Sequence, residues 1–158
     1  MIDFGIGLEL TRDAELDAHG HPSGSLRVKM FMGGEAVSDV ACFHTRERGH
    51  RYVRLPPGDY TMMHTVHAVF PDVQCLQPLG LKSPQLSRCL IHPVTRHVRP
   101  QDTADALEGC IAPYVVGAEE VAGGSDLAME QLWRLLGGWK KGKKVSLTIR
   151  NDVPAGAL

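Results

Sequence analysis

Two short stretches of the chain contain side chains that together could perform nucleophilic chemistry. His92 ends an apolar run, and Cys110 directly follows Gly109. An imidazole near a thiol can remove its proton, and the thiolate then attacks a carbonyl carbon. A glycine before the nucleophile lets a substrate backbone approach, and backbone N–H groups near the thiol can stabilise the oxyanion. The pattern therefore indicates a catalytic group of Cys110, His92 and Gly109.

Each of these residues also has a structural interpretation. A buried cysteine usually packs as a small apolar residue, and a histidine at the end of a strand is often held by a hydrogen bond. Glu108 and Asp105 could orient the imidazole as the third member of a triad, or they could be solvated surface carboxylates. We assign Glu108, Asp105 and the apolar Ile111 to the substrate-binding surroundings of the thiol.

The histidines and cysteines do not follow a metal-binding spacing. His64 and His67 are three residues apart, and so are Cys89 and His92. On a strand, positions i and i+3 face opposite sides, so neither pair converges on one ion. We therefore expect no metal site and no cofactor.

Composition places the chain among globular proteins. It has 158 residues, 43% of them hydrophobic and 22% charged, and its net charge is −1. This balance excludes full-length disorder and a broad nucleic-acid footprint, which needs an excess of Lys and Arg. A local basic cluster at residues 139–144 is expected to be a solvated turn, with contact to a phosphate-bearing polymer as the alternative. No apolar run approaches the roughly 18 residues of a membrane helix, so no membrane contact is expected.

The length predicts one globular domain over residues 1–150, followed by a flexible tail at 151–158. Four cysteines are too few for a disulfide scaffold, and we expect them to be reduced. The first residues lack a basic region followed by an apolar one, so no secretory signal is visible. The chain is therefore expected to be cytoplasmic as synthesised. Action in the periplasm or as part of a virion would need another route.

Alternation of apolar residues and turn signals predict a mostly β domain with one helix. The helix is expected to begin with Ser125 as its N-cap and to end at Gly137-Gly138. Strands are expected over 26–32, 36–44, 60–70, 88–92 and 145–149, turns at 33–34 and 56–59, loops over 17–25, 71–87 and 93–108, and a further apolar segment over 109–116. This arrangement favours an antiparallel sandwich or a partly closed barrel, with a C-terminal amphipathic helix followed by a final strand.

The region around the thiol also matches a known pattern. The chain reads Ile-His-Pro and then Asp-Thr-Ala-Asp-Ala-Leu-Glu-Gly-Cys-Ile, ending at Ile111. This resembles Ile-His-x-Gly-Asn-Thr-x-x-Asp-Thr-x-Gly-Cys-Ile, the signature of small bacterial and prophage proteins known as domain of unknown function number 5675. The turn at 55–60, the strand at 42–45 and the segment 141–149 are similar to the same family, so the resemblance spans roughly residues 25–150.

That family is similar in turn to the L,D-transpeptidase catalytic domain, which has a β-rich fold. There a peptidoglycan stem peptide acylates the cysteine, and an amine or water resolves the thioester. The resemblance implies that Cys110 is the nucleophile, that His92 is the base and that Gly109 shapes the oxyanion pocket. It also implies a cysteine acyltransferase or hydrolase that acts on peptidoglycan stem peptides without a cofactor.

The chain departs from both patterns near the motif. Residues 94–101 form an insertion, and Pro93-Val94 stands where a glycine is expected. Leu107 and Ala112 replace the serine and the arginine of the transpeptidases. These departures favour an alternative, a non-enzymatic module with the same fold. Such a module would be a structural, accessory or ligand-binding part of a phage or secretion apparatus, with other proteins of that apparatus or a small ligand as its partners.

Overall fold

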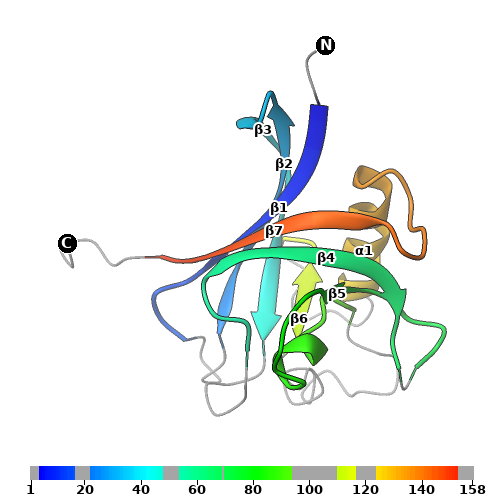
Figure 1. Ribbon diagram of the computed structural model, residues 1–158. Coiled ribbons are helices and arrows are strands. Elements are labelled where there is room, and N and C mark those ends of the chain that lie inside the picture. The colour runs from blue at the N-terminus through cyan, green and yellow to red at the C-terminus, as the bar shows by residue number, and fades with distance from the viewer. Residues whose placement is uncertain are drawn as a thin grey trace.

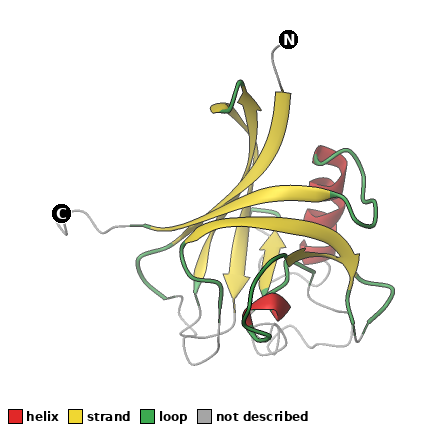
Figure 2. Cartoon of the chain, viewed as in Figure 1, coloured by secondary structure: helices red, strands yellow, loops and turns green. Residues whose placement is uncertain are grey.

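The computed structural model describes residues 4–16, 22–47, 54–68, 70–93, 110–116 and 124–152. In this part of the chain the regular structure consists of seven strands, one α-helix and one short 3-10 helix (Figures 1 and 2). Their bounds are β1 Phe4–Arg12, β2 Ser23–Met32, β3 Glu35–Glu47, β4 Gly58–Val66, β5 Gln74–Pro78, η1 Leu86–Arg88, β6 Ile111–Tyr114, α1 Gly124–Leu135 and β7 Lys144–Asn151. The predicted mostly β content is confirmed.

All seven strands belong to one curled sheet, in the order β5-β4-β7-β1-β2-β3-β6. β1, β2 and β3 form an antiparallel meander, in which Gly33 and Gly34 make the turn between β2 and β3. Their φ angles are 61° and 86°. A two-residue hairpin turn of type I′ has positive φ at both central residues, and glycine adopts such angles without strain. The predicted hairpin is therefore confirmed, although both strands are longer than expected.

The centre of the sheet is formed by strands from the two ends of the chain. β7 lies between β4 and β1 and runs parallel to β1 but antiparallel to β4. The sheet is therefore mixed, and the expectation of an antiparallel sandwich was wrong, whereas the alternative of a partly closed barrel agrees with the single curled sheet. A parallel pair needs a long connection, which local turn signals do not reveal. The curled sheet forms a half-barrel (Figure 1).

The two edges of the half-barrel are joined through one residue, Ile91. Its N–H group donates to Leu76 O at 2.9 Å and Leu76 N–H donates to Ile91 O at 3.0 Å, which forms an antiparallel bridge to β5. On its other side, Ile91 forms a parallel bridge with Ile111 of β6. In this bridge Ile111 N–H donates to Leu90 O at 2.8 Å, and His92 N–H donates to Ile111 O at 3.1 Å. Residues 90–92 therefore supply hydrogen-bond partners to both edge strands.

The helix packs its apolar face onto the core of the sheet. Its buried apolar residues belong to the same cluster as the inward-facing residues of the strands, and they are Ala128, Met129, Leu132 and Trp133; Leu136, directly after the helix, joins them. Positive φ angles at Gly137 and Gly138 end the helix as predicted. Ser125 lies inside the first turn rather than at the N-cap, because the helix begins at Gly124.

Other local predictions were wrong in their details. The expected loop at 71–87 contains β5 and η1, and the expected strand at 60–70 ends at Val66. β5 has no clear apolar alternation, and it is extended because β4 and Ile91 pair with it. Within the expected strand at 88–92, only Ile91 forms bridges.

Several predictions fall on parts of the chain outside the described residues. These are most of the loop at 93–108, most of the tail at 151–158 and part of the turn cluster at 17–25. Among the described residues, no helix has the length and apolar character needed to cross a membrane.

Candidate functional site

Residues 90–92, the closure segment of the half-barrel, determine which face the candidate catalytic side chains occupy. Ile91 and Ile111 are fully buried in the main core. Successive side chains of an extended segment point to opposite faces, so His92 and Cys110 lie on the face away from that core. A second, separate apolar cluster forms on this face from Leu90, Cys110, Ala112 and Tyr114. The bridge thus brings the predicted thiol and imidazole to one side of the sheet.

His92 is held as a neutral imidazole with one defined tautomer. His92 is only 3% exposed, and its Nδ1 lies 2.5 Å from Pro93 O. A carbonyl oxygen can only accept, so Nδ1 carries the proton and Nε2 carries the lone pair. Burial lowers the pKa of His92 to about 4, the hydrogen bond to Pro93 acts in the opposite direction, and nearby His67 lowers the pKa further. Nε2 is buried and has no hydrogen-bond partner among the described residues.

His67 follows β4 and contacts His92 through its ring. The two ring centroids are 5.3 Å apart, and the ring planes meet at 79°. Nδ1 of His67 accepts a hydrogen bond from Phe70 N–H at 3.2 Å, so the turn after β4 orients this ring. His64, in contrast, is fully buried and lies against Trp133, with ring centroids 5.0 Å apart. The two histidines therefore have different surroundings.

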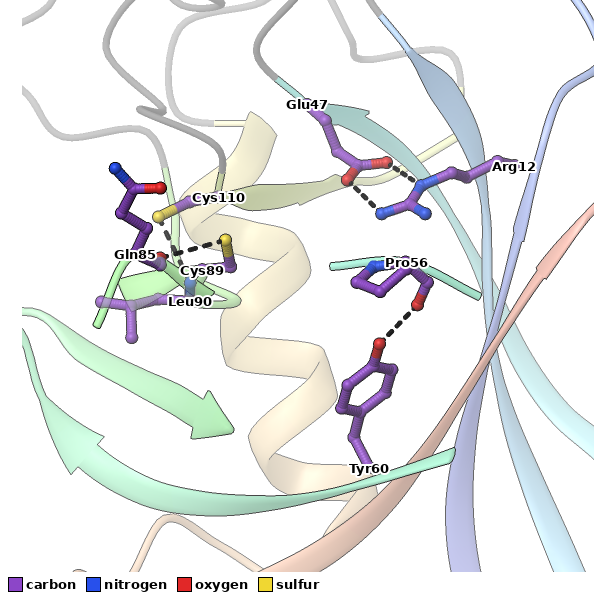
Figure 3. Close-up of polar contacts among 8 residues, drawn as sticks. All are labelled: Arg12, Glu47, Pro56, Tyr60, Gln85, Cys89, Leu90 and Cys110. Atoms are coloured by element: carbon purple, nitrogen blue, oxygen red, sulfur yellow. Dashed lines mark hydrogen bonds and ion pairs between the residues drawn. The ribbon is translucent and has the colours of Figure 1, made fainter. Parts of the chain in front are cut away.

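Cys110 uses its thiol to extend the bridge between the two segments. The residue is 4% exposed. Its Sγ accepts a hydrogen bond from Leu90 N–H at 3.3 Å (Figure 3). It also donates one to Arg88 O at 3.3 Å. Leu90 N–H and Arg88 O precede the Ile91–Ile111 bridge along the chain. The sulfur bonds to them as the backbone of a paired strand would. The thiol therefore provides a hydrogen-bond partner to two backbone groups of this ladder.

The thiol and the imidazole are neighbours along the bridge but are not hydrogen-bonded to each other, since Nε2 of His92 has no partner within the described chain. Cys110 lies opposite Leu90, and His92 lies two residues further along. Strand geometry separates the Cα atoms of such diagonal neighbours by about 8 Å. An aromatic side chain can bridge a diagonal of this kind. Formation of the pair would require the thiol proton to turn from Arg88 O toward Nε2.

The other predicted site residues are placed as follows. Ile111 is fully buried in the main core, on the side of the sheet away from the thiol. Gly109, Glu108 and Asp105 lie outside the described residues.

Sequence reasoning missed two features of the site. It considered His67 only as a metal partner of His64, and it assigned no role to the backbone of Arg88 and Leu90. The alternation of side chains between the two faces across 89–92 could have revealed part of this. Cys89 and Ile91 are fully buried in the main core, while Leu90 lies in the second cluster. That alternation indicates which residues share a face with His92. It does not indicate which segment will pair with them.

A second polar group lies inside the half-barrel (Figure 3). Arg12 and Glu47 are 5% and 0% exposed, and the guanidinium donates two hydrogen bonds of 2.8 Å to the carboxylate. Burial raises the pKa of the nearby Cys89 thiol to about 11; the charge of Glu47 raises it as well, and Arg12 opposes this change. Cys89 is therefore un-ionised at neutral pH and is a poorer nucleophile than an ordinary thiol.

No group of three or more His, Cys, Asp or Glu side chains within the described ranges could hold a metal ion. Comparisons of the chain with family models, with curated proteins and with solved structures found no match.

Proposed function

We propose that the chain is a cysteine-dependent acyltransferase or hydrolase whose substrates are peptidoglycan stem peptides. The observation that supports this most is the state of His92, whose tautomer is fixed by Pro93 and whose lone pair on Nε2 is unpartnered within the described chain. A general base needs a lone pair in a fixed orientation. The substrate class is inferred from the resemblance of the thiol motif to L,D-transpeptidases.

In the proposed reaction, Nε2 of His92 takes the proton from Sγ of Cys110, and the thiolate attacks the carbonyl carbon of a stem-peptide amide. His92 then gives this proton to the leaving amine, which leaves a thioester on Cys110. An incoming amine completes transfer, and water completes hydrolysis. In either case the sulfur regains a proton. Action on peptidoglycan would require delivery of the chain to the periplasm or its presence in a virion.

The observed arrangement corresponds to a resting state of this reaction. Both residues are at most 4% exposed, and burial disfavours the charged thiolate–imidazolium pair. A substrate can reach the sulfur only if the side chains that cover it move. Contact with water or with a polar substrate would then bring the pKa of His92 back toward its ordinary value.

The test is incubation of the protein with purified sacculi, followed by mass spectrometry of the stem peptides. We expect shortened or newly cross-linked stems with the native chain and none with Cys110→Ala. Cys42→Ala is the matched control, because Cys42 is an exposed thiol away from the site. The absence of any product with the native chain, or the same products with Cys110→Ala, would contradict the proposal.

The second candidate is a non-enzymatic module of a phage or secretion apparatus. It is favoured by the structural use of the Cys110 thiol, which bonds to the backbone at Arg88 and Leu90. Mass spectrometry of the intact protein after incubation with a stem peptide distinguishes the two candidates, because the resting thiol is buried in both. The enzyme forms an acyl adduct on Cys110 that Cys110→Ala lacks, whereas the non-enzymatic module forms none.

A further inference from the structure

The loop that connects α1 to β7 forms a surface pocket of its own. The pocket has a volume of 750 Å³ and is lined only by residues 137–143. Three of these residues are lysines, and Lys144 follows directly, while no acidic residue lines the pocket. The pocket therefore concentrates positive charge in a chain whose net charge is −1.

This loop is fixed to β4 by hydrogen bonds around His64. Gly142 N–H donates to His64 O at 2.9 Å, and His64 N–H donates to Lys143 O at 2.7 Å. Lys140 N–H donates to Nδ1 of the same histidine at 3.3 Å. His64 is fully buried, so the loop is anchored inside the protein rather than at its surface. A pre-organised loop loses less conformational entropy when it binds a ligand.

The lysines of the loop have different roles. Lys143 donates from Nζ to Leu136 O at the C-terminal end of the helix, where a positive charge is favourable. Lys140, Lys141 and Lys144 are exposed and form no ion pair within the described parts of the chain. Lys140 and Lys141 therefore add positive charge to the pocket itself, and Lys144 adds charge at the residue that follows it.

Glycine keeps the floor of the pocket open. Gly138 and Gly142 have φ angles of 93° and 86°, and no atom lies within 4 Å of the position that a Cβ would occupy at either residue. These angles require glycine. Most N–H groups of the loop are already donated inside the protein, among them those of Gly138, Lys140 and Gly142. The lysine side chains, rather than the loop backbone, therefore make the contacts to an anion.

We propose that this loop is a binding site for a phosphate-bearing anion, in which Lys140 and Lys141 make the charged contacts and Lys144 lies at the rim. A lysine ammonium is a compact point charge that suits phosphate oxygens. The basic charge does not continue along the chain, so the ligand is a compact phosphate group rather than a long nucleic acid. The site is separate from the thiol and does not depend on the proposed catalysis.

Trp139 makes the proposal measurable, because it lies in the loop and its Nε1 donates to Thr65 O at 3.2 Å. We would titrate the full chain with sodium tripolyphosphate at low ionic strength and follow tryptophan fluorescence. A second titration would use vesicles that contain phosphatidic acid. The variants are the double substitution Lys140→Gln with Lys141→Gln, and Lys82→Gln as an exposed lysine outside the loop.

We expect a saturable fluorescence change with at least one of the two ligands. The double variant should bind about tenfold more weakly, while Lys82→Gln should change the affinity less than about twofold. Binding of tripolyphosphate identifies a free phosphate as the ligand, and binding of vesicles alone identifies a lipid headgroup. The proposal is overturned if neither ligand binds, or if Lys82→Gln weakens binding as much as the double variant does.

Discussion

Ile91 and Ile111 form the parallel bridge that determines the position of both candidate catalytic side chains. Both isoleucines are fully buried, so the residues beside them turn to the opposite face. The same bridge, together with the pairing of Ile91 and Leu76, connects the two edges of the half-barrel. Closure of the sheet and assembly of the candidate site therefore depend on one residue.

We expect Ile91→Ala to lower the free energy of unfolding by about 2–5 kcal/mol, because the substitution leaves a cavity where the edge strands meet. Leu127→Ala is the matched control, since Leu127 is an apolar residue that is 46% exposed on the helix. The control should change stability by less than about 0.5 kcal/mol. Urea unfolding followed by circular dichroism measures both variants. Equal losses would show that the closure segment is not part of the cooperative core.

The pKa of His92 predicts a loss of stability in acid. An unfolded histidine takes up its proton near pH 6.5, whereas the folded chain keeps His92 neutral down to about pH 4. Above pH 6.5 neither state is protonated and His92 causes no pH dependence. Between pH 6.5 and 4 only the unfolded state binds the proton, so stability falls by about 3 kcal/mol in total. Urea unfolding at a series of pH values measures this loss.

The control for this prediction is His92→Asn, which keeps a side-chain N–H near Pro93 but does not titrate. Burial, and then the charge of Lys143, also lower the pKa of His64, so some acid sensitivity should remain in the variant. The informative quantity is therefore the difference between the native chain and the variant. Parallel pH profiles for the two proteins would contradict the assigned state of His92.

Local sequence patterns predicted those parts of the fold that local chemistry determines. Gly33-Gly34 requires a tight hairpin, and the apolar spacing before Gly137 requires a helix. The parallel pairing of β1 with β7 and the formation of β5 depend on partners far away in sequence. β1 itself was not predicted, because its position between β2 and β7 appears only when the chain is folded.

The candidate site was predictable only as a pair of residue types. The sequence led only to the prediction that Cys110 and His92 form a catalytic pair, and the bridge places the two residues on one face. It does not indicate that the sulfur bonds to Arg88 O and Leu90 N–H, since these contacts arise from the pairing of two distant segments. The contact of His67 with His92 arises in the same way, from the turn that follows β4.

The buried ion pair between Arg12 and Glu47 should make the chain sensitive to the loss of either charge. Glu47→Gln leaves an uncompensated guanidinium inside the half-barrel, and we expect a loss of about 3–5 kcal/mol. The double variant Arg12→Met with Glu47→Leu removes both charges and should recover most of this stability. Chemical unfolding of the two variants under the same conditions measures the difference.

An exposed ion pair of the same chemistry provides the control. Nη2 of Arg134 lies 2.7 Å from Oε1 of Glu130, but the two side chains are 75% and 59% exposed. Glu130→Gln should therefore cost less than about 1 kcal/mol. A loss with Glu130→Gln as large as that with Glu47→Gln would show that burial does not determine the effect.

Gly24 should be the strand glycine that tolerates a side chain least. A Cβ at this position would meet the backbone at Thr11 O and would approach Arg12 Cα to 3.1 Å, so β1 and β2 would have to separate. We expect Gly24→Ala to cost about 1–3 kcal/mol, as overpacking of an ordered interior does. Gly5→Ala is the matched control on β1, because no atom lies within 4 Å of its Cβ position. The unfolding midpoint in urea should fall for Gly24→Ala and stay nearly constant for Gly5→Ala. If both variants kept the native midpoint, β1 would be able to move away from β2 without loss of stability. The close pairing that holds Arg12 beside Glu47 would then not be required for stability.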